Sequence, residues 1–214
     1  MISRRVLLCA GALAPVATSS FAAAQTYTVG KEYLTVTPQA PTSAAKIEVV
    51  EFFAYTCPHC LQFQPIFHSW AEHAPSDVTV RVCPVAWQPK YLPFTETYFA
   101  LEALGLLDKV SLPFFESVIF QTHSYNFESA AADIRSFMEQ QGIDGEKWTK
   151  TVSSFGVRNK ARISTQLWQA YQIDSTPMIG VGGRFTTGPH LVGTRNATPA
   201  CIDYLVEQCR RARS

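Results

Sequence analysis

The sequence predicts an α/β protein that carries an inserted all-helical segment, and three observations lead to this fold class. Residues 47–55 are apolar, β-branched and aromatic almost throughout, and a helical pattern and a second strand-like stretch follow them. Residues 89–169 then have helical character. The chain finally returns to a short apolar stretch, a turn and a terminal helix. Strand–helix–strand, a helical block, then a hairpin and a helix is the order of an α/β fold with an insertion.

Residues 1–24 have the features of a secretory signal peptide. Arg4 and Arg5 precede an apolar run, and small residues follow it at the expected cleavage site. The run is shorter than the roughly 20 residues that span a bilayer, and Pro15 interrupts it. We therefore expect export and a mature chain that starts at Gln25, by either the Sec or the twin-arginine route.

Composition excludes several functions. The chain has 18 Lys+Arg and 17 Asp+Glu, and loss of Arg4 and Arg5 with the signal would leave 16 against 17, a net charge of −1. No basic stripe indicates a nucleic-acid partner, and no second apolar run is long enough to span a membrane. With 47% hydrophobic residues, the mature chain is expected to be globular with one good core.

The first α/β part of the chain contains two long strands and a helix, after a short strand at residues 32–36. Residues 47–55 are expected to form a central strand, because a strand buried on both faces is apolar without alternation. Pro58 suits the first turn of a helix, and we expect this helix to reach about His73. Residues 78–85 alternate well enough for the next strand.

The inserted segment and the end of the chain follow the same reasoning. The helices expected in the insertion span residues 95–107, 110–123, 129–141, 145–155 and 157–171. Residues 177–182 form a short apolar strand, and a hairpin leads into residues 184–187. The final helix is expected over residues 197–211, with Thr198 or Asn196 as its N-cap.

Two of the six cysteines form the pair that points to chemistry: Cys57 and Cys60, separated by Pro58 and His59. This spacing places both sulfurs within one helical turn, with Cys57 at the helix N-terminus. There, unpaired backbone N–H groups and the helix dipole stabilise a thiolate, and a protonated His59 would add positive charge. A stabilised thiolate is a good leaving group, so this pattern indicates a disulfide donor.

Two other interpretations of the pair are weaker. A structural disulfide that closes a two-residue loop would add little stability. A structural zinc site needs four ligands, and no second close Cys/His pair occurs in the sequence. We therefore expect redox chemistry and no metal.

Cys83, Cys201 and Cys209 remain after Cys9 leaves with the signal. Cys201 and Cys209 lie eight residues apart, and in one helix this spacing is roughly 12 Å, too far for a disulfide. Cys83 could pair with either of them. The alternative is that all three are small buried residues.

A resemblance becomes specific at the active-site segment. Residues 52–60, with the sequence FFAYTCPHC, resemble the redox segment of the thioredoxin fold. The dipeptide Pro58-His59 is similar to the DsbA family of periplasmic thiol:disulfide interchange proteins. Thr176 and Pro177 stand where that fold has its cis-proline loop, and the helical insertion also matches DsbA. The resemblance implies a cis Thr176–Pro177 bond, with the nearby backbone pairing with substrate peptide.

The resemblance covers nearly all of residues 25–214 and implies a thioredoxin-like fold with an inserted all-helical subdomain. Residues 25–88 and 170–214 would form the discontinuous thioredoxin-like domain, and residues 89–169 the helical insertion. The implied function is that of a periplasmic disulfide oxidase acting on unfolded or folding exported proteins. A DsbB-like membrane partner would reoxidise it. It would act as a monomer and need no cofactor beyond its own disulfide.

The resemblance also implies a role for each active-site residue. Cys57 would be the exposed sulfur that exchanges with substrate, and Cys60 the buried resolving sulfur. Pro58 and His59 would tune the acidity of the Cys57 thiol. Glu51, six residues before Cys57, matches an acidic position beneath the active site of the family.

A carboxylate such as Glu51 inside an apolar strand is costly unless it has a partner or takes up a proton. The family often pairs this acid with a lysine on the following strand. That strand, residues 78–85, contains Arg81 and no lysine, so Arg81 is the available substitute. The alternative is that Glu51 lies at a strand edge and reaches water.

Three other functions are open at this point. The protein could be a reductase or isomerase of the same fold, a periplasmic protein that holds a soft metal through Cys57, His59 and Cys60, or a non-catalytic chaperone. The redox equilibrium of the cysteine pair, the metal content after purification and the activity of Cys57→Ser distinguish these functions.

Overall fold

The computed structural model describes residues 26–42 and 45–213, so the signal peptide expected at residues 1–24 lies outside the described part of the chain. Within those ranges a five-stranded sheet has the order β1-β5-β4-β2-β3. The strands are β1 (Tyr33–Thr35), β2 (Ile47–Phe53), β3 (Val78–Pro84), β4 (Met178–Val181) and β5 (Phe185–Thr187). β2 runs parallel to β3 and antiparallel to β4. All seven residues of β2 are buried, which confirms the prediction of a central strand.

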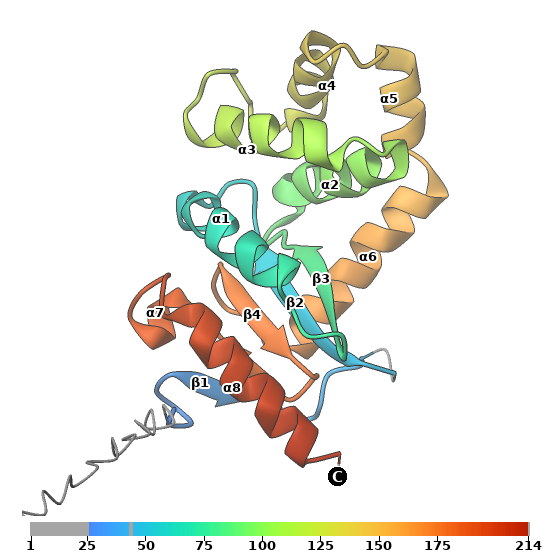
Figure 1. The fold of residues 1–214 in the computed structure, drawn as a ribbon. Helices are drawn as coiled ribbons and strands as arrows, with labels where there is room; N and C mark the ends of the chain where they lie inside the picture. Colours follow the sequence, from blue (N-terminus) through green and yellow to red (C-terminus); the bar gives the residue numbers. More distant parts are fainter. Residues whose placement is uncertain (1–25, 43–44, 214) are drawn as a thin grey trace, which may run out of the picture.

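Helices cover both faces of the sheet (Figure 1). α1 (Pro58–Glu72) and α8 (Thr198–Arg211) pack on one face, where Ile47 and Val49 of β2 contact residues of both helices. α6 (Phe155–Ala170) packs on the other face, against Val50 and Phe52. Because side chains alternate along a strand, Glu51 points to the face of α1. The predicted α/β layers are confirmed.

Apart from α6, which packs on the sheet, the helices of the insertion form a block at one end of the sheet (Figure 1). They are α2 (Leu92–Leu104), α3 (Leu112–Ile119), α4 (Ala130–Gln140) and α5 (Gly145–Val152), with a 3₁₀ turn at Pro89–Tyr91 and a π-helical turn at Leu107–Ser111. Their core is continuous with the active-site end of the sheet, because Phe53, Tyr55 and Cys60 belong to the same buried cluster as Phe114 and Phe115. The helical block therefore supports the segment that carries the cysteines.

Several element ends differ from the prediction. α2 begins three residues earlier than expected, since Pro93 is accommodated in its first turn, and it ends at Gly105, whose φ of 67° forms a left-handed C-cap. α3 is shorter than expected at both ends, because a π-helical turn precedes it and Gln121, with a φ of 54°, lies outside the helical region after its C-cap Phe120. A further short helix, α7 (Pro189–Val192), was not predicted.

The predicted N-cap of the last helix is wrong. Ala197 occupies that position and makes no side-chain cap. Thr194 substitutes for it from outside the helix, since its hydroxyl accepts a hydrogen bond from the Ala197 N–H and its carbonyl accepts one from the Thr198 hydroxyl. These two hydrogen bonds join the loop before α8 to the start of the helix.

The structure also decides the pairing of the remaining cysteines. Cys83 faces α6, where its sulfur lies 3.0 Å from the Ser164 hydroxyl. Cys201 and Cys209 lie on α8, across the sheet. A disulfide from Cys83 to either one is therefore wrong. All three are buried free thiols, and the prediction that Cys201 and Cys209 are not linked is confirmed.

None of the described helices has the length and apolar character needed to cross a membrane.

Candidate active site

Cys57 is the N-cap of α1, and its local geometry follows from the sequence around it. The Cys57 N–H donates to the Ala54 carbonyl at 3.0 Å, which turns the chain out of β2. Pro58 then occupies the first helical position, where no N–H partner is needed. The Cys57 sulfur accepts a hydrogen bond from the Cys60 N–H at 3.4 Å. The N-terminus of α1 thus points at the Cys57 sulfur.

This environment acidifies the Cys57 thiol. The hydrogen bond from the Cys60 thiol is the largest cause and, with the Thr176 side chain and the backbone N–H groups of Cys60 and His59, outweighs partial burial to lower the pKa of Cys57 to about 6. These donors all stabilise the thiolate. Cys57 is therefore suited to leave as a thiolate near neutral pH.

Cys60 has the opposite character. It is 1% exposed, and burial raises the pKa of its thiol strongly, with a further increase from the neighbouring Cys57. A buried, protonated thiol does not attack substrate, but it can donate a hydrogen bond to the thiolate beside it. The two sulfurs therefore divide into one reactive and one supporting group.

The loop before β4 lies against Cys57. The Thr176–Pro177 bond is cis, as the resemblance implied. The Cys57 thiol donates to the Thr176 carbonyl at 3.3 Å, a contact that favours the protonated thiol, whereas the Thr176 side chain lowers the pKa of Cys57. Residues 57 and 176, distant in sequence, thus meet at one reactive sulfur.

Glu51 is buried in the centre of the sheet. It is 6% exposed, and its neighbours across β2 are the apolar residues Val82 on β3 and Ile179 on β4. Burial raises the pKa of the Glu51 carboxyl to about 8. Within residues 26–42 and 45–213, no ion pair or hydrogen bond to its side chain is formed. The strand-edge alternative is therefore wrong.

Arg81 is not the partner of Glu51, which corrects a sequence expectation. In the parallel register Arg81 lies opposite Val50 and therefore points to the face of α6. There its guanidinium is 4.0 Å from the buried carboxylate of Glu48. The position that faces Glu51 on β3 belongs to Val82, one residue further along.

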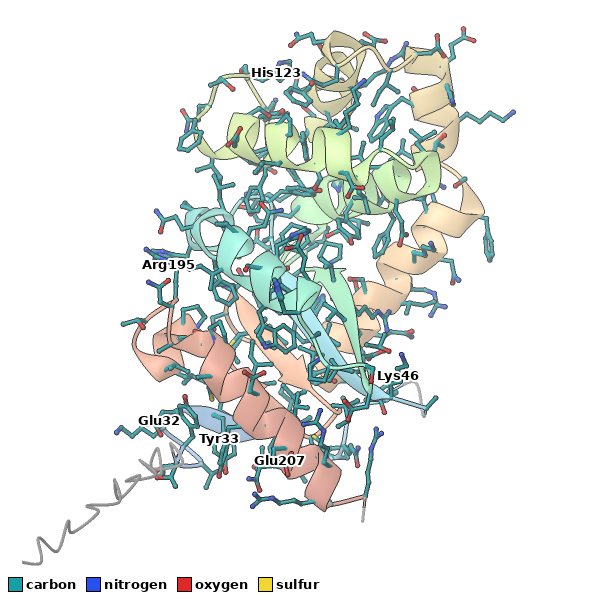
Figure 2. The ribbon with its side chains drawn as sticks, viewed as in Figure 1. Glu32, Tyr33, Lys46, His123, Arg195 and Glu207 are labelled. Carbon is teal, nitrogen blue, oxygen red and sulfur yellow. The ribbon has the colours of Figure 1, made fainter. Side chains whose placement is uncertain are left out.

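A groove of about 700 Å³ adjoins Thr176 and Pro177. One side is formed by His59 and Ile66 of α1, and the other by the segment around α7, including His190 and Arg195. Figure 2 shows Arg195 on the loop that follows α7. Pro58 and His59 are exposed, as expected for residues beside a reactive sulfur.

Sequence reasoning missed His190 and Arg195. Neither belongs to a recognisable motif, and only the folding of the α7 segment towards α1 brings them near the redox pair. For metal binding, no three His, Cys, Asp or Glu side chains come together within the described ranges in a way that could hold an ion.

Comparisons with known proteins agree with this geometry. The sequence model of a family described as "Thioredoxin" matches residues 41–197. The thiol:disulfide interchange protein DsbA of Bordetella parapertussis is 36% identical over 207 residues, 96% of this chain and 96% of that protein. DsbA of Burkholderia cepacia is 33% identical over 205 residues, 95% and 94% of the two chains.

A solved structure gives the same result in three dimensions. The crystal structure of Pseudomonas aeruginosa DsbA aligns with a TM-score of 0.80 at 30% identity, covering 87% of this chain and 96% of that chain. The sequence relatives align along nearly the whole length of this protein, and the fold and helical insertion coincide. The chain therefore belongs to the DsbA family of thiol:disulfide interchange proteins, and it is a thiol–disulfide oxidoreductase with a thioredoxin-like fold.

Proposed function

We propose that this protein donates a disulfide to exported proteins in the periplasm through Cys57 and Cys60. The observation that carries the proposal is the stabilised Cys57 thiolate at the N-terminus of α1. Stabilising the thiolate stabilises the reduced pair, so the oxidised pair accepts electrons readily. The direction of exchange is then towards oxidation of the substrate.

The exchange takes two steps. A substrate thiolate attacks the Cys57 sulfur of the Cys57–Cys60 disulfide, forming a mixed disulfide while Cys60 leaves and takes up a proton. A second substrate thiolate then attacks the substrate sulfur of the mixed disulfide, and Cys57 leaves as a thiolate. The substrate dithiol loses two electrons and the cysteine pair gains them. The raised pKa of Cys60 favours its protonation after the first step.

We assign supporting roles to the other predicted site residues. Pro58 and His59 tune Cys57, supported by the position of Pro58 in the first helical turn and by the His59 backbone N–H that stabilises the thiolate. Glu51, a proton-binding group in the apolar strand beneath the active site, tunes the reactivity of the cysteine pair. Thr176 and Pro177 bind substrate backbone, which the 3.3 Å contact of Thr176 with Cys57 supports.

We also propose a domain organisation and a cellular location for this chain. Residues 1–24 direct export and are removed, residues 25–88 and 170–214 form the thioredoxin-like domain, and residues 89–169 form the helical insertion. A DsbB-like membrane protein reoxidises the pair. The protein acts as a monomer, with its own disulfide as the only redox group.

The test is the equilibrium of the mature protein in glutathione redox buffers, with Cys60→Ser as the control that cannot form the internal disulfide. We expect a potential more oxidising than the glutathione couple, and a reduced form that resists urea better than the oxidised form. A strongly reducing potential would place the protein among the reductases instead.

A further inference from the structure

The groove beside the redox pair has an unbalanced charge. None of the twelve described residues that line it is Asp or Glu. Three of them have basic side chains: His59, His190 and Arg195. His59 comes from α1, while His190 and Arg195 come from the α7 segment and the loop after it. Two sides of the groove thus present groups that can carry positive charge and none that carries negative charge.

Arg195 is available to a ligand. It is exposed, and among the residues that the structure describes it forms no ion pair with a carboxylate. Of the acidic side chains on α1 and α8, Glu72 lies 3.5 Å from His68 and Asp203 accepts a hydrogen bond from Trp70. Asp174 precedes the groove, accepts from the Ser175 hydroxyl and does not line the cavity.

The groove is continuous with the reacting sulfur. Thr176 lines it, and the Thr176 carbonyl is 3.3 Å from the Cys57 sulfur. A substrate segment whose cysteine reaches Cys57 therefore has its neighbouring residues beside Thr176 and in the groove. Arg195 lines the same groove, so substrate residues close in sequence to that cysteine can approach it.

We propose that the groove selects extended substrate segments that carry carboxylates close to the reacting cysteine, with Arg195 as the principal specificity-determining residue. This inference rests on the proposed disulfide exchange and names the class of substrate sequence that it favours. The attraction acts between exposed charges, so it increases the exchange rate of acidic segments and is weakened by salt.

The experiment uses three peptides of identical length, each with two cysteines, that differ only in two residues beside the first cysteine: two aspartates, two asparagines or two lysines. The oxidised mature protein oxidises each peptide under pseudo-first-order conditions. Flanking charges also change the acidity of the peptide thiols. Each rate constant is therefore divided by the rate constant of the same peptide with 2,2′-dipyridyl disulfide, which is uncharged at neutral pH.

We expect the normalised rate of the aspartate peptide to exceed that of the lysine peptide by about fivefold at low ionic strength, the scale of exposed ion pairs. The ratio should approach one in about 1 M salt, where the Debye length is about 3 Å. Arg195→Gln should abolish the preference and Arg195→Glu should reverse it. Arg162→Glu, an exposed site on α6 with the same change in net charge, should keep it.

Equal normalised rates for the three peptides, or a preference that Arg195→Glu leaves intact, would overturn the inference and leave the proposed disulfide exchange standing. If none of the peptides is oxidised, the proposed function itself fails. Circular dichroism of each variant establishes that the fold is retained before the rates are compared.

Discussion

The buried carboxyl of Glu51 predicts a specific dependence of stability on pH. Its pKa is raised by burial from 4.5 to about 8, and its neighbours across the sheet are Val82 and Ile179. Between these pH values the folded protein holds a proton that the unfolded chain releases. Folding stability from this group is therefore fully present below pH 4.5 and is lost as the pH rises towards 8.

The size of this change in the free energy of unfolding follows from the two pKa values of Glu51. Each pH unit contributes about 1.4 kcal/mol. From pH 4.5 to pH 7 the free energy of unfolding falls by about 3 kcal/mol through Glu51, and above pH 8 the loss approaches about 5 kcal/mol. Glu51→Gln has nearly the same shape and does not ionise. We therefore expect this variant to match the natural protein at pH 4.5 and to exceed it by about 3 kcal/mol at pH 7.

The assay is urea unfolding of the reduced protein at pH 4.5, 7 and 8. The free energy of unfolding must fall with urea concentration at the same slope for the natural protein and the variant. Glu72→Gln is the matched control, because it removes an exposed carboxylate of α1 whose side chain is 60% accessible. It should change the free energy of unfolding by at most about 0.5 kcal/mol.

A constant difference between Glu51→Gln and the natural protein from pH 4.5 to pH 8 would refute the reasoning. That result would mean that the carboxyl ionises in the folded protein as easily as in water, through a partner or a path to solvent. An increase in stability that grows with pH for Glu72→Gln as well would show that the effect does not come from burial.

Two further predictions concern the redox pair and the sheet. The pKa of Cys57 is lowered from 9.0 to about 6, so its contribution to the stability of the reduced protein should be complete above pH 9 and lost as the pH falls through 6. The ultraviolet absorbance of the thiolate should therefore titrate near pH 6. Titration near pH 9 would contradict this prediction. Gly180→Ala would place its Cβ against the Tyr171 ring and should lower the free energy of unfolding by about 1–3 kcal/mol in urea, whereas Gly156→Ala, with nothing within 4 Å of its Cβ, should not destabilise.

The sequence by itself determined the local geometry of the redox pair. Cys57 and Cys60 are three residues apart, and their geometry depends only on a helix that begins at Pro58. Such local relations can be predicted because the backbone repeat places the groups together. The central strand was equally predictable, because a β-branched and aromatic run that is apolar at nearly every position is typical of a strand buried on both faces.

The tertiary structure alone decided the relations between distant segments. Whether Arg81 or Val82 faces Glu51 depends on the register of two strands, and a shift of one residue reverses the face of every side chain. The separation of Cys83 from Cys201 depends on which face of the sheet each helix covers. Arg195 reaches the groove because the α7 segment folds back towards α1. These features arise from packing between elements far apart in the chain, and no local pattern in the sequence encodes them.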